Sequence, residues 1–378
     1  METTTPADSA DGPAQLLVSE RALLQNLDTY RALAPGSEAA CVVKADAYGC
    51  SARLCSRLFY DAGVRRFFVA TYEEAQELVD LFDEEEKLGL RVYVLADRFT
   101  RMASPHPSVV PVVSSSEDLG ALLAQLEDPG ARPRDVCLHG ETGMNRFALP
   151  VDEIEPALQR LGGLREQGRV DEVLVMSHLA CADDPQASMN EAQALAFERM
   201  VQDYPWLKTS LAGTGGTQLG KRFQRDIIRV GIGMYGGESS TATDAPKLEP
   251  VIAVSAPIIQ VKTVERGQSV GYGAAFTADR AMKVATVRLG YADGIDRRFS
   301  ELGLAGYISG EPCPVIGRVS MDLITLDVTH IDEAQIPIGA RALFLVGEQD
   351  INWAARQLGT ISYEVLTSLG ARLERRLV

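Results

Sequence analysis

The sequence predicts an α/β protein in which an N-terminal (β/α)8 barrel of the TIM type is followed by a mostly β C-terminal domain. Two observations carry this prediction. Between about residues 40 and 236, short β-rich runs alternate with helical stretches, whereas after about residue 240 helical stretches become rare. A polar, proline-containing segment, ESSTATDAPKLEP (238–250), separates the two regions. We therefore expect a disordered lead-in over 1–14, the barrel over 15–240 and the β-domain over 241–378.

The β-rich runs of the first region are short and apolar, as buried parallel strands are. They cover residues 41–45, 66–70, 91–95, 109–113, 135–139, 172–178, 208–212 and 228–232. Amphipathic helical patterns separate most of them, over 50–63, 71–86, 116–128, 151–164 and 190–204. Eight such strands fit a closed barrel, but a doubly wound sheet alternates in the same way, so the count only favours the barrel.

The second region is rich in apolar or alternating runs punctuated by glycine, a pattern typical of β-structure. These runs are VIAVSAPIIQVKTV (251–264), KVATVRLG (283–290), PVIGRVSMDLITLDVT (314–329) and RALFLVG (341–347). Helices are expected only near the end, over 351–359 and 363–376.

Composition and charge exclude several classes of function. The formal net charge is −15, which argues against nucleic acid as a partner because phosphate binding needs a basic surface. No apolar run approaches the ~20 residues that cross a membrane, and the N-terminus lacks the features of a signal peptide. The six cysteines show neither metal-ligand spacing nor the density of a disulfide framework. We therefore expect a cytoplasmic protein with reduced thiols, no metal and no membrane partner.

Polar residues that can carry chemistry follow several of the predicted strands. Lys44 ends the first strand in VVKADAYG, Arg146 lies in the loop HGETGMNRF (139–147), and His178 ends the sixth strand. Glycine-rich loops follow the seventh and eighth strands, in AGTGGT (212–217) and RVGIGMYG (229–236). Each feature alone has an ordinary explanation: a solvated strand-end lysine, a surface arginine, a packed core histidine or a simple turn.

Their common location favours a catalytic site, because the carboxyl ends of barrel strands share one mouth. Burial lowers the pKa of a lysine and frees its amine as a nucleophile. Glycine loops after strands seven and eight are where barrels commonly bind phosphate. A Schiff-base lysine beside a phosphate site indicates pyridoxal phosphate as the cofactor.

At this point the chain resembles the alanine racemase family. The resemblance rests on VVKADAYG, TGMNR, MSHLACADD, RVGIGMYG, VGYG, GYADG, GRVSMD and TISYEVL, which occur in order from about Ala22 to the C-terminus. It implies a fold-type III pyridoxal-phosphate enzyme that interconverts L- and D-alanine. It also implies a small amino acid as substrate and a head-to-tail homodimer with shared active sites.

The resemblance also implies roles for individual residues. Lys44 resembles the lysine that holds the cofactor. His178 resembles the imidazole against the pyridine ring, and Arg229 the arginine at the pyridine nitrogen. The remaining positions match contacts to the cofactor phosphate: Tyr48, Thr214, Gly231, Ile232 and Tyr363.

Racemisation needs two bases, one on each face of the α-carbon. By resemblance these are Lys44 and Tyr272, with Tyr272 supplied by the partner subunit. A free phenol ionises only near pH ~10, so a tyrosine base needs a cationic or hydrogen-bonded neighbour. Arg146 and Met321 match substrate-contacting positions, with Arg146 on the carboxylate side. Three further positions match the entry corridor of the family: Tyr291, Arg297 and Arg318.

The chain departs from the family pattern near Arg146. Where the family has a lysine that can be carbamylated, this chain has His139, followed by Glu141; a neutral His139 or Glu141 is then expected to support Arg146. This departure leaves a racemase for another amino acid, such as serine, as an alternative. A fold-type III decarboxylase is a weaker one, because the VGYG tyrosine and the pyridine-facing arginine are both present. A non-catalytic cofactor-binding protein would resemble the barrel alone.

Overall fold

The predicted β-rich runs of the first region form one sheet of eight parallel strands. Its strands are β2 (Glu38–Val42), β3 (Arg66–Val69), β4 (Arg91–Val94), β5 (Val109–Val113), β6 (Arg134–His139), β7 (Val170–Met176), β8 (Lys208–Ser210) and β9 (Ile227–Val230). Neighbours follow the order β8-β7-β6-β5-β4-β3-β2-β9. A parallel bridge between Gly213 and Arg229 joins the two outer strands. The sheet is therefore a nearly closed barrel, and the doubly wound alternative is wrong.

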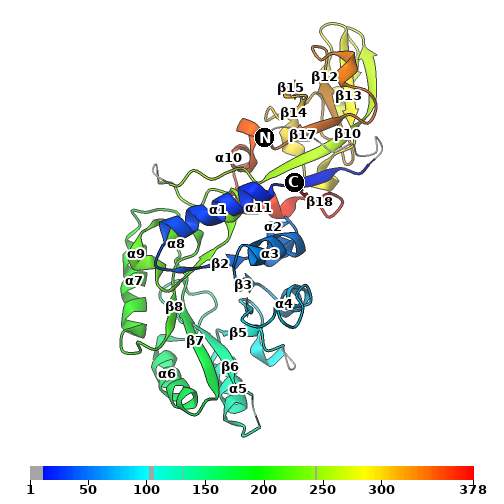
Figure 1. The fold of residues 1–378 in the computed structure, drawn as a ribbon. Helices are drawn as coiled ribbons and strands as arrows, with labels where there is room; N and C mark the ends of the chain where they lie inside the picture. Colours follow the sequence, from blue (N-terminus) through cyan, green and yellow to red (C-terminus); the bar gives the residue numbers. More distant parts are fainter. Residues whose placement is uncertain (1–11, 102–105, 131, 243–244) are drawn as a thin grey trace. The chain divides into compact units, whose positions relative to one another are not determined.

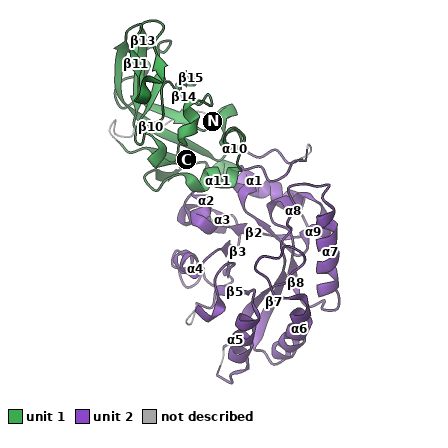
Figure 2. Ribbon diagram, turned by 180° about the vertical axis from the view of Figure 1, so that it is seen from behind, with its two compact units in different colours: residues 1–22, 250–378 green, residues 23–249 purple. Residues whose placement is uncertain are grey.

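The computed structural model describes residues 12–101, 106–130, 132–242 and 245–378. They form two compact units (Figure 2). Residues 23–249 are called the barrel unit, and residues 1–22 with 250–378 the β unit. The two units are described separately.

Helices surround the strands of the barrel unit (Figure 1). They are α1 (Glu20–Leu33), α2 (Lys44–Tyr48), α3 (Ala52–Asp61), α4 (Tyr72–Val79), α5 (Ser116–Glu127), α6 (Val151–Glu166), α7 (Ser188–Val201), α8 (Thr214–Gln218) and α9 (Lys221–Gln224), with 3-10 turns η1 (Phe99–Arg101) and η2 (Ile232–Tyr235). Inside the barrel, Arg66 of β3 is 5% exposed and pairs with both carboxylate oxygens of Glu172 on β7, at 2.6 and 2.9 Å. Because β3 and β7 lie four strands apart in the sheet, this bidentate pair spans the barrel interior.

The β unit is built on a second sheet and two short helices. Its strands are β1 (Gln15–Val18), β10 (Ile252–Val264), β11 (Ser269–Val270), β12 (Phe276–Thr277), β13 (Met282–Val287), β14 (Ala305–Ile308), β15 (Glu311–Pro314), β16 (Ile324–Asp327), β17 (Arg341–Phe344) and β18 (Glu374–Leu377). Its helices are α10 (Ile351–Leu358) and α11 (Ser362–Ser368), with 3-10 turns η3 (Tyr272–Ala274), η4 (Tyr291–Asp293), η5 (Arg297–Ser300), η6 (Glu333–Gln335) and η7 (Gly347–Gln349). β11 and β12 pair only with each other.

The boundaries of the units differ from the predicted ones in two places. β1 pairs antiparallel with β10 and parallel with β18, so residues 15–22 belong to the β unit rather than to the barrel. Residues 241–249 belong to the barrel unit, where Glu249 N donates to Asn26 Oδ1 at 2.8 Å. Most of the predicted lead-in over 1–14 lies outside the described residues, but Ala14 is buried.

The predicted helix over 363–376 is only half correct. α11 ends at Ser368, and Glu374–Leu377 form the edge strand β18 beside β1. A run of charged and apolar residues fits either structure, and pairing with β1 decides the outcome.

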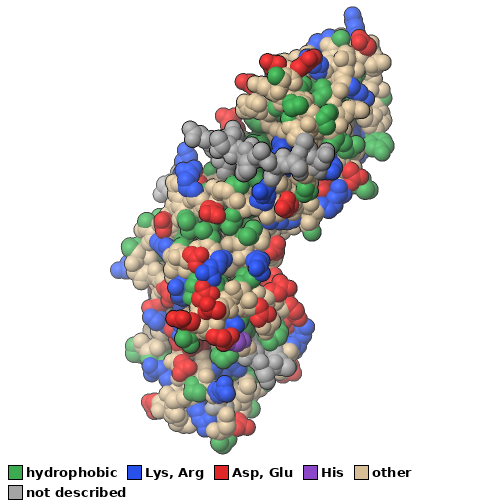
Figure 3. All heavy atoms as spheres, turned by 45° about the vertical axis from the view of Figure 1, so that its right-hand side comes forward, with side chains coloured by type: hydrophobic (Ala, Val, Ile, Leu, Met, Phe, Trp, Pro, Cys, Tyr) green, Lys and Arg blue, Asp and Glu red, His purple; other side chains and the backbone are tan. Residues whose placement is uncertain are grey.

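None of the helices in the described part of the chain is long and apolar enough to cross a membrane. On the face shown in Figure 3, lysine and arginine side chains are interspersed with aspartate and glutamate.

Candidate active site

Lys44 lies two residues after the end of β2, and its side chain is half-buried. The next four residues, 45–48, all have φ of 53 to 54°, so the chain makes a left-handed turn. Such backbone costs roughly 1–2 kcal/mol per residue, and the surroundings must hold it. Ala45 N donates to the Glu74 carboxylate at 2.7 Å, and Gly49 closes the turn with φ 84°. Lys44 is therefore presented by a strained but well-anchored segment.

The environment of Lys44 favours its neutral amine. Burial lowers the pKa of Lys44, the positive charge of Arg146 lowers it further, and Glu74 opposes the shift. A neutral amine is the form that attacks a carbonyl carbon. The structure thus brings Lys44 and Arg146 to the same end of the barrel, although they follow different strands.

Arg229, a buried residue of β9, contacts His178, a half-buried residue that follows β7. Arg229 Nη1 donates to Ser210 Oγ at 2.6 Å, and Nη2 donates to the Ser177 carbonyl at 2.6 Å and lies 3.3 Å from His178 Nδ1. Burial, followed by the charges of Arg229 and Arg146, lowers the pKa of His178 to about 3. Burial lowers the pKa of Arg229 to about 10, so Arg229 stays a cation at neutral pH. His178 is then neutral and its Nδ1 accepts the bond, which places its proton on Nε2.

The two glycine-rich loops, 212–217 and 229–236, meet next to Tyr48. Gly231 N donates to Thr214 Oγ1 at 2.9 Å, and both residues are buried. A Cβ at Gly231 would collide with Tyr48 Oη, so only glycine allows this close approach. Ile232 starts the 3-10 turn that follows. The hydroxyls of Thr214 and Tyr48 and the backbone of Gly231 thus lie together in one small region.

The loop that carries Arg146 is closed by hydrogen bonds to the carboxylate of Glu141, a residue of the same loop. Glu141 accepts hydrogen bonds from Gly143 N and from Asn145 N, the latter at 2.9 Å. Burial alone would raise the pKa of Glu141, but these backbone donors lower it, so Glu141 is ionised. Glu141 was expected to support Arg146, and its carboxylate instead folds the loop.

His139 is neutral beside this loop. Burial, followed by the charges of Arg229 and Arg146, lowers the pKa of His139 to about 4. Arg146 itself is exposed, and among the residues that the structure describes no carboxylate pairs with it. Its guanidinium is therefore available for an external anion.

In the β unit, three predicted motif loops pack together. Ala292 N donates to the Met321 carbonyl at 3.0 Å, which joins GYADG to GRVSMD. A Cβ at Gly273 would lie 3.0 Å from Arg318 Nη1, which places VGYG beside the same GRVSMD loop. The group leaves aromatic and apolar side chains exposed: Tyr272 is 72% exposed and Met321 is 52% exposed.

The predicted corridor residues are only partly grouped. Tyr291 and Arg297 line one cavity of about 420 Å³ within the β unit, whereas Arg318 lies against VGYG. Tyr363, the remaining expected phosphate contact, is half-buried in α11.

Residues 18–239 match the model of the alanine racemase N-terminal domain, and residues 251–377 match that of the C-terminal domain. The chain belongs to the alanine racemase family. The barrel and the β unit therefore correspond to the two domains of alanine racemases.

Relatives extend over nearly the whole chain. The biosynthetic alanine racemase of Agrobacterium fabrum is 36% identical over 376 residues, covering 96% of this chain and 93% of that protein. The catabolic alanine racemase of the same organism is 33% identical over 381 residues, covering 100% and 95%. Among solved structures, the Bartonella henselae alanine racemase with covalently bound pyridoxal phosphate has a TM-score of 0.82 at 29% identity. That match covers 97% of this chain and 100% of the other.

Within this alanine racemase fold, the expected residues fall into two groups. The barrel unit holds Lys44, Tyr48, Arg146, His178, Thr214, Arg229, Gly231 and Ile232, and the β unit holds Tyr272, Met321 and Tyr363. Sequence reasoning missed two supporting residues, Glu74 and Ser210. The pattern T-x-x-E is typical of a capping box, and Thr71 and Glu74 do form one at the start of α4. The same pattern gives no sign of the hydrogen bond that Glu74 accepts from Ala45 N.

Proposed function

We propose that this chain racemises alanine with pyridoxal phosphate, using Lys44 and Tyr272 as the two bases. The observation that carries the proposal is the convergence at one barrel mouth of a lysine with a lowered pKa, an arginine that pairs with no carboxylate of the described residues, and a glycine-loop cradle. The two family domains and the curated relatives support the same activity.

The residues present fit the cofactor. Tyr48, Thr214 and the backbone at Gly231 and Ile232 would hold the phosphate, since the Tyr48 and Thr214 hydroxyls lie beside the backbone of this glycine-rich loop. Tyr363 of the β unit would complete this set. Lys44 would hold the aldehyde carbon, and His178 would lie against the ring. When bound, the cofactor draws electrons from the substrate and so acidifies its α-hydrogen.

Arg229 sets the type of reaction. As a buried cation it only donates hydrogen bonds, so beside the pyridine nitrogen it would leave that nitrogen without a proton. An unprotonated nitrogen withdraws fewer electrons, which favours rapid return of the proton to the α-carbon. This arrangement favours racemisation over transamination.

Arg146 would bind the substrate carboxylate, and Met321 would limit the space for the side chain. Lys44 would exchange the proton on one face of the α-carbon and Tyr272 on the other. Tyr272 is 72% exposed in this chain, which suits a residue that acts in a partner's site. We therefore propose a cytoplasmic homodimer with shared active sites.

The test of this function is a combined activity and labelling experiment. The purified protein is offered a panel of L- and D-amino acids that includes alanine and serine, and is reduced with borohydride in parallel. Interconversion of alanine above all others, and a pyridoxyl group on Lys44, are the expected results. Preference for serine would change the substrate, and labelling of another lysine would contradict the site.

His139 gives a second prediction, because the family pattern has a carbamylatable lysine at this position. A neutral imidazole cannot form the charge-assisted pair that a carbamate forms with Arg146. The KM of the wild type for alanine is therefore expected to be independent of bicarbonate, whereas His139→Lys should show a KM that falls when bicarbonate is added. Steady-state kinetics of both proteins with and without bicarbonate check this. Stimulation of the wild type by bicarbonate would contradict it.

A further inference from the structure

A buried glutamine of α7 connects two loops of the barrel mouth. Gln193 is 0% exposed, and its amide is fully used. Oε1 accepts a hydrogen bond from Ala180 N at 2.8 Å, and Nε2 donates to the His178 carbonyl at 2.8 Å and to Thr142 Oγ1 at 3.1 Å. An amide offers two donors on its nitrogen, and both have an acceptor here. Gln193 therefore joins the loop that begins at His178 to the loop that carries Arg146.

Ser177 contacts both Thr142 and Arg229, the first through its hydroxyl and the second through its backbone carbonyl. Thr142 Oγ1 and Ser177 Oγ are 2.7 Å apart, and the Ser177 carbonyl accepts from Arg229 Nη2 at 2.6 Å. Either hydroxyl can donate in the contact between Thr142 and Ser177. Gln193 is thus linked through Thr142 to the Ser177 side chain, while the backbone carbonyl of Ser177 holds the Arg229 guanidinium.

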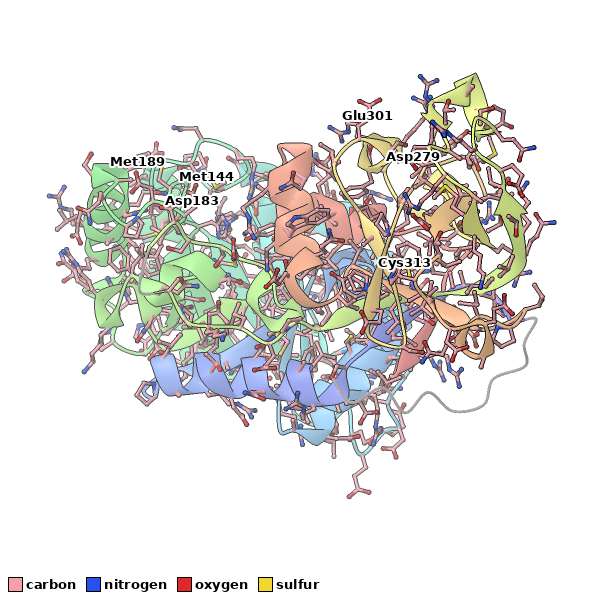
Figure 4. The ribbon with its side chains drawn as sticks, turned by 90° about the horizontal axis from the view of Figure 1, so that it is seen from above. Met144, Asp183, Met189, Asp279, Glu301 and Cys313 are labelled. Atoms are coloured by element: carbon pink, nitrogen blue, oxygen red, sulfur yellow. The ribbon has the colours of Figure 1, made fainter. Side chains whose placement is uncertain are left out.

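Packing against α7 reinforces this link. A Cβ at Gly143, where φ is +129°, would meet Met189 Cε at 2.9 Å and Gln193 Cγ at 3.6 Å. A Cβ at Gly140 would collide with Met200 Sδ. Figure 4 labels Met144 of the loop and Met189 of α7 on the same side of the molecule. The backbone of the loop is therefore seated directly on one face of α7.

We propose that Gln193 is a positioning residue that aligns Arg146 and His178 with one another. The proposal rests on the function given above, because it assigns Arg146 to the substrate carboxylate. Gln193 touches neither residue's reacting atoms; it holds the backbone of His178 and, through Thr142, the turn that Glu141 closes before Arg146. Small displacements of such groups have large kinetic effects.

The test compares Gln193→Met with the matched control Gln159→Met. Gln159 is an exposed α6 residue whose amide donates to Glu155 at 3.4 Å and has no other partner among the described residues. Gln193→Met should raise the KM for alanine about tenfold with a smaller change in kcat, because the carboxylate site is misaligned while Lys44 is untouched. Hydrogen–deuterium exchange should become faster over residues 140–147 and at the Ala180 amide. The control should change neither quantity.

A second variant keeps the proposal testable if Gln193→Met does not fold. Thr142→Val removes the acceptor that links Gln193 to the Arg146 loop, together with the hydrogen bond to Ser177 Oγ, but leaves the bond from Ala180 N to Gln193 in place. Exchange should therefore rise over 140–147 but not at Ala180. Folded variants with unchanged KM and unchanged exchange would overturn the proposal, as would a lower Tm with wild-type kinetics. The exchange measurement needs no racemase activity, so a wild type inactive on alanine would contradict the proposed function while leaving this test of Gln193 intact.

Discussion

Mixing Lys44→Ala protein with Tyr272→Phe protein is expected to restore racemase activity that neither has alone. If each site takes Lys44 from one subunit and Tyr272 from its partner, a hybrid dimer has one site with both residues intact and one with neither. Random exchange of equal amounts makes half of the dimers hybrids. The mixture should therefore recover about a quarter of the wild-type activity, as two-fold symmetry requires.

The structural reason is the placement of Tyr272. Its side chain is 72% exposed, beside Met321 in a group of loops that belongs to the β unit, whereas Lys44 belongs to the barrel unit. A catalytic phenol needs partners that shift its ionisation, and an exposed position without them would be ineffective. The family architecture implies that a second subunit supplies these partners to Tyr272.

The control is a mixture in which no intact site can form. Lys44→Ala combined with the Lys44→Ala, Tyr272→Phe double variant has no functional lysine in any subunit, so its activity should stay at background. Native mass spectrometry of differently tagged subunits verifies that exchange has taken place. Absence of recovery after verified exchange would show that each chain completes its own site.

The positions of the barrel strands were predictable because local sequence determines them. Most of the runs between residues 41 and 232 are apolar enough to be buried on both faces, and all eight became strands of one sheet. Lys44, His178 and Arg229 were then placed at one mouth by topology alone, since parallel strands end on the same side. The structure adds that Arg229 and His178 are in contact, at 3.3 Å.

Features that depend on tertiary pairing were not predictable in the same way. β1 is a four-residue apolar strand whose sequence does not reveal which sheet it joins, and β18 pairs beside it despite a helix-like pattern. The left-handed turn at 45–48 contains no glycine, so the sequence gives no signal for it. The hydrogen bond from Ala45 N to Glu74, which anchors this turn, is visible only in the structure. Gln193 resembles any helix residue until its three hydrogen bonds are seen.

The Tyr272→Phe variant should separate the two bases by isotope exchange. Removing one general base is expected to lower the rate of racemisation by about 10²- to 10⁴-fold. Because L- and D-alanine have equal free energy, kcat/KM must fall equally in both directions, so racemisation rates cannot tell which face was affected. Exchange of the α-hydrogen with solvent can.

In D₂O, Lys44 still removes the α-hydrogen from one enantiomer, exchanges it with solvent and returns deuterium to the same face. That enantiomer should therefore lose its α-proton NMR signal without inverting, while the other keeps both its signal and its configuration. Tyr307→Phe, which removes a phenol from β14 in the same unit, should exchange both enantiomers like the wild type. If Tyr272 acts on one face only, its removal must leave exchange by Lys44 on the other face intact. Equal loss of exchange from both enantiomers in Tyr272→Phe would therefore show that this phenol is not a face-specific base.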